Sequence, residues 1–99
     1  MVAAVAQLNH SPKIFAEFVL TKSWQEIGMQ VHRLGGTYQG FSGEGHNARI
    51  DFSYRDYEFH IQEAGRIVLL KVQDSTCPEI VLSEVQRHFA ALMSSHLSD

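Results

Sequence analysis

Asp51 and His60 are the two residues whose types and spacing come closest to a catalytic pair. They lie on two segments of alternating apolar and polar residues, 48–54 and 57–62, joined by the dipeptide at 55–56. A two-residue turn between the segments would place Asp51 directly opposite His60 on the polar face of a hairpin. A carboxylate in that position orients an imidazole and favours its protonated form, which is part of a general-base arrangement. One hypothesis for the function is therefore a small hydrolase-like enzyme that uses this pair.

A nucleophile for such an enzyme is not evident beside the pair. Ser53 would lie on the same face, one position along and opposite Glu58. Cross-strand contacts between a carboxylate and an imidazole are also frequent as purely structural pairs. The sequence therefore gives Asp51 and His60 as candidates and assigns a catalytic role to no residue.

Metal and thiol chemistry both lack the ligand spacing that they need. The six histidines include no His-x₃-His pair on one helix, and no cysteine or paired carboxylate joins them locally. These histidines are His10, His32, His46, His60, His88 and His96. Cys77 is the single cysteine, so the chain has no resolving thiol for redox work and cannot form an internal disulfide. We expect no metal site and no cofactor.

The glycine-rich segment 35–47 is a second motif that falls short of a site. It holds five of the seven glycines, a composition that would suit a loop binding phosphate through backbone amides. It is not followed by Lys-Ser/Thr, however, and Glu44 lies inside it. The segment predicts a flexible connection, within which the residues 37–41 have the pattern of a short strand.

Strands must position the candidate pair, and the clearest pattern in the chain is typical of them. In 48–54 and in 57–62, apolar residues alternate with polar ones on either side of the turn at 55–56. An even-length turn places Phe52 opposite Phe59, whereas an odd one would set apolar residues opposite polar ones. The pattern predicts an antiparallel hairpin with one apolar face.

A third strand follows in the segment 66–73. A two-residue turn at Ala64-Gly65 would pair it with 57–62 and bring Lys71 opposite Glu58, which is a favourable contact between opposite charges. The same register keeps the apolar residues of both segments on one face. The three segments together predict a three-stranded antiparallel meander.

Residues 13–20 form the first element. Their alternation of apolar and polar side chains favours a strand, although Ser11-Pro12 would also suit the start of a helix. We favour the strand, because the residues 21–23 make a clean break after it. The apolar positions on one side of this strand are Ile14, Ala16, Phe18 and Leu20.

Two helices are predicted from capping motifs and from apolar spacings of three and four. Ser23 and Glu26 form a capping box, and Gly35-Gly36 can end the helix that it starts. Thr76 and Glu79 predict a second capping box ahead of a C-terminal helix. The apolar stripes are Trp24, Ile27, Val31 and Leu34 in the first helix, and Leu82, Val85, Phe89 and Leu92 in the second.

The elements follow in the order β-α-(β)-β-β-β-α, where the strand in parentheses has the weakest pattern. This order predicts the α+β class: a two-layer sandwich in which an antiparallel sheet carries both helices on one face. A chain of 99 residues is long enough for one small domain and too short for two. We expect that domain to span 1–99, with frayed ends in the leader 1–12 and the tail 94–99.

Ile67 and Leu69 are the most informative apolar residues outside the predicted core. They lie on the polar face of the meander, where the expected register pairs them with Gln62 and His60. Large apolar residues on both sides of one strand indicate that its polar side is also covered. The chain's own leader or first helix is one candidate for the cover, and a second copy of the chain across a two-fold axis is the other.

The polar face therefore predicts a binding surface that has an apolar centre and a charged rim. Its residues are Arg49, Asp51, His60, Ile67, Leu69 and Lys71. The leading hypothesis is a non-catalytic protein-binding or adaptor module that acts through this open sheet face, as a homodimer. The hydrolase-like enzyme is the alternative. A binding face should be broad and shallow, whereas an enzyme needs a concave pocket with a perturbed titrating group.

The composition limits which kinds of partner and which cellular compartment we expect. The formal net charge is −3, from 8 basic and 11 acidic residues, so the chain lacks the basic excess of proteins that neutralise nucleic-acid phosphates. Its apolar runs are far shorter than the roughly 20 residues that cross a membrane, and its first residues do not resemble a secretory signal. We expect a protein partner or self-association, no nucleic acid and no membrane, in the cytoplasm.

Overall fold

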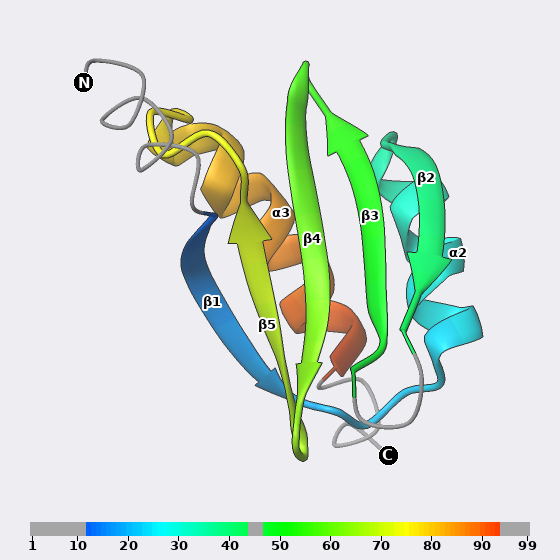
Figure 1. Ribbon diagram of the computed structural model, residues 1–99. Coiled ribbons are helices and arrows are strands. Elements are labelled where there is room, and N and C mark those ends of the chain that lie inside the picture. The colour runs from blue at the N-terminus through cyan, green and yellow to red at the C-terminus, as the bar shows by residue number, and fades with distance from the viewer. Residues whose placement is uncertain (1–11, 44–46, 94–99) are drawn as a thin grey trace.

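The computed structural model describes residues 12–43 and 47–93, which form five strands and two helices (Figure 1). In chain order these elements are β1 (Lys13–Val19), α2 (Trp24–Leu34), β2 (Thr37–Ser42), β3 (Arg49–Tyr54), β4 (Tyr57–Ala64), β5 (Ile67–Val72) and α3 (Glu79–Met93). The order matches the predicted one and includes the strand within the glycine-rich segment. The expected fraying concerns residues that, apart from Pro12, lie outside the described part of the chain.

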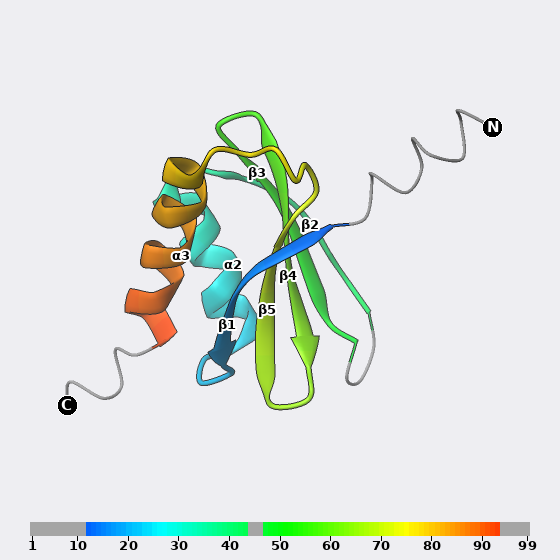
Figure 2. The ribbon, with the colours of Figure 1, turned by 90° about the vertical axis from the view of Figure 1, so that its left-hand side faces the viewer.

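The five strands belong to one sheet with the order β1-β5-β4-β3-β2, and every neighbouring pair is antiparallel. Strands β1 and β2 are thus the two edges. Helices α2 and α3 lie on the same face of the sheet, as the edge-on view in Figure 2 shows. The predicted two-layer α+β fold is confirmed, and the first element is a strand rather than a helix.

Local hydrogen bonds fix both ends of α2. The Ser23 hydroxyl oxygen accepts the Glu26 N–H at 3.1 Å, and the Glu26 carboxylate accepts the Ser23 N–H at 3.4 Å, which is the predicted capping box. At the other end Gly35 is left-handed, with a φ of 97°, and the Gly36 N–H donates to the Val31 carbonyl at 2.9 Å. The glycines therefore end the helix as predicted, in a Schellman motif.

Helix α3 begins later than the sequence predicts. The N–H and the hydroxyl of Thr76 both donate to the Asp74 carboxylate, at 2.9 and 2.6 Å, and the Pro78 carbonyl accepts the first helical N–H groups instead. The predicted second capping box is wrong, because Asp74 offers Thr76 a local turn that competes with the cap. Neither α2 nor α3, the two helices of the described residues, has the length and apolar character to cross a membrane.

The core lies between the sheet and the helices, with Phe59 near its centre. The Phe59 ring stacks on Phe52 with 5.3 Å between centroids and meets Phe15 edge-on at 5.8 Å. Phe52 also contacts Phe89 of α3 at 5.9 Å. The predicted apolar face of the meander is therefore the core. Its buried strand residues include Ile50, Phe52, Phe59, Ile61, Val68, Leu70 and Val72, and the helices add Ile27, Val31, Val81, Leu82, Val85, Phe89 and Met93.

The first hairpin has the predicted register, with Asp51 opposite His60. Its turn residues Arg55 and Asp56 have φ values of 52° and 71°. Two left-handed residues in a row form a type I′ turn, which matches the twist of the strands and is best supplied by Asn-Gly or Asp-Gly. The turn therefore has the predicted length of two residues. Arg55 and Asp56 nevertheless adopt a backbone conformation that is strained for residues other than glycine.

Replacing Asp56 with glycine should raise the free energy of unfolding by about 0.5–1 kcal/mol, because glycine adopts a positive φ without steric conflict. Asp56 is exposed, so the substitution removes little packing. Chemical denaturation measures the effect. Asp56→Ala is the matched control, since it removes the same carboxylate and keeps a Cβ atom, and it should give no gain. Equal stabilisation by both variants would assign the effect to charge and contradict the backbone explanation.

The second hairpin is offset by two residues from the predicted register. Ala64 pairs with Ile67, so the turn residues are Gly65 and Arg66 rather than Ala64 and Gly65. The backbone explains the difference: Gly65 has a φ of 70°, and a positive φ at the first turn position favours glycine there. The position of this one glycine in the turn sets the pairing of the whole strand.

This offset changes the neighbours on the polar side of β5. Lys71 lies opposite His60 rather than Glu58, and Leu69 lies opposite Gln62 rather than His60. The predicted contact between Glu58 and Lys71 is therefore wrong. Because side chains alternate with a period of two, an offset of two leaves every side chain on its predicted face.

Strand β1 contains a bulge, which the alternating pattern of the sequence did not predict. The pairing with β5 shifts between Ile14 and Ala16, so the extra residue Phe15 interrupts the alternation. Ala16 is buried on the core side, whereas Ile14 lies opposite Lys71 and is 48% exposed. The expectation that Ile14 shares the apolar face of this strand is wrong.

Candidate functional site

The face of the sheet opposite the helices brings the predicted binding residues together. Figure 1 looks onto this face, and Figure 2 shows both helices on the other side. We call it the outer face. Its side chains include Glu17, Val19, Arg49, Asp51, His60, Gln62, Ile67, Leu69 and Lys71. No helix or strand of the described residues crosses the outer face, so the six residues named from the sequence share one surface.

Arg49, Asp51, His60 and Gln73 form a hydrogen-bonded row on the outer face, which we call the polar row. His60 Nδ1 lies 2.7 Å from Asp51 Oδ1, and His60 Nε2 lies 3.0 Å from Gln73 Oε1. The guanidinium of Arg49 contacts both oxygens of this carboxylate: Nε lies 2.9 Å from Asp51 Oδ1, and Nη2 donates to Oδ2 at 3.3 Å. The predicted contact between Asp51 and His60 is confirmed.

The polar row occupies both nitrogens of His60, which limits the chemistry of the imidazole. A general base needs a nitrogen lone pair aimed at a substrate proton, usually within a pocket. The His60 side chain is 13% exposed, and its two nitrogens already face Asp51 and Gln73. Four hollows lined by described residues lie along the helices, and neither Asp51 nor His60 lines any of these four. This geometry suits a rigid polar part of a contact surface better than a catalytic base.

Val19, Ile67 and Leu69 form an apolar area beside the polar row, which we call the apolar strip. Val19 pairs with Ile67 across the β1–β5 ladder, and Leu69 follows two residues along β5. Val19 is 62% exposed, and the two β5 residues are half-buried. Lys71 borders the strip and donates to Gln62 Oε1 at 2.6 Å. The apolar strip therefore lies toward the β1 edge of the sheet, and hydrogen-bonded polar groups border it on the side of β4 and β3.

Sequence reasoning missed Gln73 of the polar row and Val19 of the apolar strip. The Gln73 N–H donates to the Glu58 carbonyl at 2.8 Å, so Gln73 lies opposite Glu58 and within reach of His60. The register expected from the sequence would have carried Gln73 past the end of the strand pair. Val19 was hidden for another reason, because it joins Ile67 only through the pairing of the first strand with the last.

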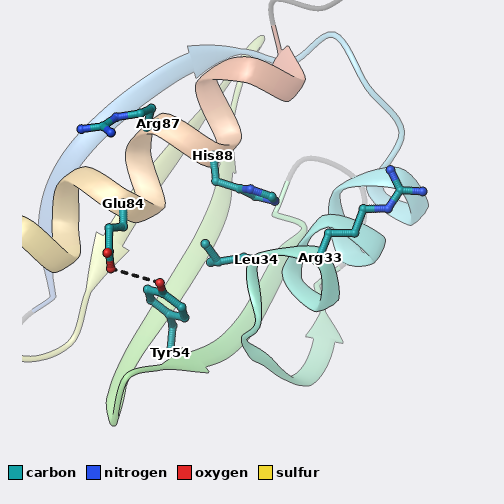
Figure 3. A pocket seen from close by; sticks show the side chains of 6 residues that line it. All are labelled: Arg33, Leu34, Tyr54, Glu84, Arg87 and His88. Atoms are coloured by element: carbon teal, nitrogen blue, oxygen red, sulfur yellow. Dashed lines mark hydrogen bonds between the residues drawn. The ribbon is translucent and has the colours of Figure 1, made fainter.

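A hollow of about 320 Å³ lies between the end of α2 and the middle of α3 and is a second candidate site (Figure 3). Glu84 accepts hydrogen bonds there from Arg55 Nε at 2.7 Å and from the Tyr54 hydroxyl at 3.0 Å, and these bonds lower the pKa of the Glu84 carboxyl. The guanidinium groups of Arg33 and Arg87 point away from each other in Figure 3. The hollow therefore does not present two cations to one anion. It is lined by Arg33, Leu34, Tyr54, Glu84, Arg87 and His88.

Residues 12–43 and 47–93 contain neither a cluster of metal ligands nor an activated thiol. No group of three or more His, Cys, Asp or Glu side chains in this part of the chain could hold a metal ion. Cys77 is buried, and burial, with Asp74 and Glu79 nearby, raises the pKa of its thiol. A raised pKa is the opposite of what thiolate chemistry requires. The histidines His10, His46 and His96 lie outside the described residues.

The chain matches no protein-family model, no curated protein and no solved structure.

Proposed function

We propose that the protein is a non-catalytic protein-binding or adaptor module that acts through the outer face, and that it works as a homodimer. The observation that carries this proposal is the apolar strip of Val19, Ile67 and Leu69 on a face that no described element covers. Apolar residues inside a hydrated polar rim are typical of protein interfaces. Covering a large apolar side chain contributes roughly 1.5–3 kcal/mol, which association can recover.

A second copy of the chain fits the outer face because that face carries both signs of charge. Arg49 and Lys71 lie near Asp51 and Glu17, so two copies related by a two-fold axis can place opposite charges against each other. A stable dimer would need the whole of this face. Five strands about 4.8 Å apart and about 20 Å long present a flat area on the order of 500 Å², and the relief of the side chains adds to it. A stable dimer needs about 800 Å² of accessible surface per partner.

Replacing Leu69 with lysine should shift the protein from dimer to monomer. A lysine in the centre of the interface would bury an ammonium group without a partner, which association cannot repay. Static light scattering should give twice 11.2 kDa for the wild type and 11.2 kDa for the variant. Val19→Lys tests the same strip at a position that is 62% exposed in the single chain, where a lysine does not disturb the core.

Ile80→Lys is the matched control for the dimer. Ile80 is 71% exposed and lies on α3, on the side of the sheet away from the outer face, so this variant should remain a dimer. Thermal unfolding followed by circular dichroism shows whether each variant is folded. A monomeric wild type would overturn the homodimer, and a Val19→Lys variant that is still dimeric would overturn the outer face as its interface.

The hydrogen bond between Asp51 and His60 favours a second candidate, the hydrolase-like enzyme. The carboxylate orients the imidazole, which is one requirement of a general base. The contacts of both imidazole nitrogens and the lack of a nucleophile beside the pair leave this candidate behind the binding module. Hydrolysis of a chromogenic acetate ester, retained in Leu69→Lys and lost in His60→Gln, would reverse that order.

We further place this module in the cytoplasm. Cys77 is the single cysteine of the chain and is buried as a free thiol, a state that a reducing compartment maintains. On the outer face Arg49 and Lys71 are balanced by Glu17 and Asp51, which supports a protein partner over nucleic acid.

A further inference from the structure

The edge strand β2 offers a second interaction surface, separate from the outer face. β3 is the only strand that pairs with β2 in the described part of the chain, so one side of β2 keeps backbone N–H and C=O groups without a ladder partner. Such an edge is a template for the addition of another strand. Whether another chain can pair with this edge depends on the residues that protect it.

Strand β2 has much less protection than the opposite edge. Edge strands are usually guarded by charged side chains, proline or bulges, because these discourage pairing with another chain. Strand β1 has all three, with Pro12 before it, Lys13 and Glu17 within it, and its bulge at Phe15. Strand β2 has the sequence TYQGFS, which contains no charge and no proline, and its one guard is a bulge between Tyr38 and Gly40.

An apolar hollow runs beside this edge, between β2 and α2, and we call it the edge hollow. Trp24 and Tyr38 line both parts of it, which measure about 230 and 310 Å³. The Trp24 and Phe41 rings lie 5.9 Å apart, and Phe41 is 50% exposed. Gly28 keeps the floor open, since a Cβ atom there would lie 3.4 Å from the Tyr38 ring. The lining residues are Trp24, Gln25, Gly28, Met29, His32, Tyr38 and Phe41.

We propose that β2 and the edge hollow bind an extended, uncharged peptide segment of a partner protein by strand addition. The backbone of the segment pairs with the free side of β2. Every second side chain then points toward the helix layer, where an aromatic or branched aliphatic group packs on Trp24 and Phe41. Strand β2 is six residues long, so the segment needs about six residues in extended conformation.

The uncharged lining of the edge hollow favours an uncharged occupant. None of the seven residues that line the edge hollow is Asp, Glu, Lys or Arg. A charged side chain placed there would lose hydration without gaining an ion pair, whereas an apolar one loses nothing. A helix would leave the backbone groups of β2 without partners, because its own groups are already paired internally. An extended uncharged segment satisfies both the hollow and the edge.

Trp24 allows a direct test, because it is the only tryptophan of the chain and lines the edge hollow. The full-length protein is titrated with the capped hexapeptide acetyl-Thr-Val-Thr-Phe-Thr-Val-amide while Trp24 emission is recorded. We expect a saturable shift of the emission to shorter wavelength. The same peptide with N-methyl groups at alternate residues, on the side that would face β2, cannot donate to the strand and should cause no shift. Equal shifts from both peptides would overturn strand addition.

Variants locate the binding on β2. Phe41→Lys and Met29→Lys each place a charge at the edge hollow, at positions that are both 50% exposed, and each should raise the Kd of the peptide at least tenfold. Ile80→Lys, 71% exposed on α3, should leave the Kd unchanged. Unchanged affinity in both hollow variants, with all proteins folded by circular dichroism, would contradict the proposal. A Trp24 shift that grows with protein concentration alone would mean that a second copy occupies this edge, and would also overturn the peptide assignment.

Discussion

Replacing Phe59 with alanine should lower the free energy of unfolding by about 3–5 kcal/mol, the loss expected when a fully buried aromatic ring is truncated. Phe59 is 1% exposed, stacks on Phe52 at 5.3 Å and meets Phe15 at 5.8 Å, so its removal leaves a cavity beneath two other rings. Domains of this size are stable by roughly 5–15 kcal/mol, so the variant would keep little of its stability. Denaturation by urea, monitored by circular dichroism, measures the loss.

Phe41→Ala is the control for this experiment, since it makes the same chemical change at a side chain that is 50% exposed. Phe41 lies at an edge of the sheet, where water already covers half of the ring. Its truncation should lower the free energy of unfolding by clearly less than the Phe59 substitution. A loss below about 1 kcal/mol for Phe59→Ala would mean that the ring faces solvent, and the register of the first hairpin would then be incorrect.

Gly36→Ala should destabilise the fold by about 1–3 kcal/mol, because the added methyl group has no space. A Cβ atom at Gly36 would lie 2.8 Å from the Ser53 carbonyl oxygen and 3.4 Å from side-chain atoms of Phe52 and Val31. The Ser53 oxygen belongs to the backbone of β3 and cannot move without disturbing the strand. The end of α2 would therefore be pushed off the sheet, and thermal unfolding should begin at a lower temperature.

The matched substitution Gly28→Ala should have the opposite sign. Gly28 lies inside α2, where alanine favours the helix by roughly 0.8–1.0 kcal/mol over glycine. The nearest atom to its added methyl group is Tyr38 Cε1 at 3.4 Å, on a side chain rather than on backbone. A gain for Gly28→Ala together with a loss for Gly36→Ala assigns the effect to the close approach of Gly36 to the backbone of β3. Losses of equal size in both variants would point to a general intolerance of alanine instead.

The alternation of side chains predicts which face of a strand is buried, and it does so for β3, β4 and β5, whereas the bulge in β1 breaks it at Ile14. It cannot distinguish two registers that differ by two residues, because both leave every side chain on the same face. Glycine resolves that choice in the second hairpin, where the positive φ of Gly65 puts the turn one residue later than the sequence suggested. The two candidate turns both contained Gly65, and only the backbone conformation tells which position it occupies.

The candidate site was predictable to the extent that it is local. Asp51 and His60 lie nine residues apart on one hairpin, so a two-residue turn at 55–56 brings them together. Gln73 depends on the register of the next hairpin, and Val19 depends on the pairing of the first strand with the last. The edge hollow combines a helix with a strand that the sequence marked only faintly. Residues brought together by tertiary packing carry no signal in the spacing of a single sequence.

The strand order has a consequence for how this protein is made. Strand β1 is synthesised first among the strands, yet its partner is β5, the last one. During translation at about 5–20 residues per second, residues 13–19 wait several seconds until residues 67–72 have left the ribosome. The guards on β1, Pro12, Lys13 and Glu17, then protect an unpaired nascent strand in a crowded cell. The residues that protect this edge in the folded protein would thus also keep the growing chain from aggregating before β5 pairs with β1.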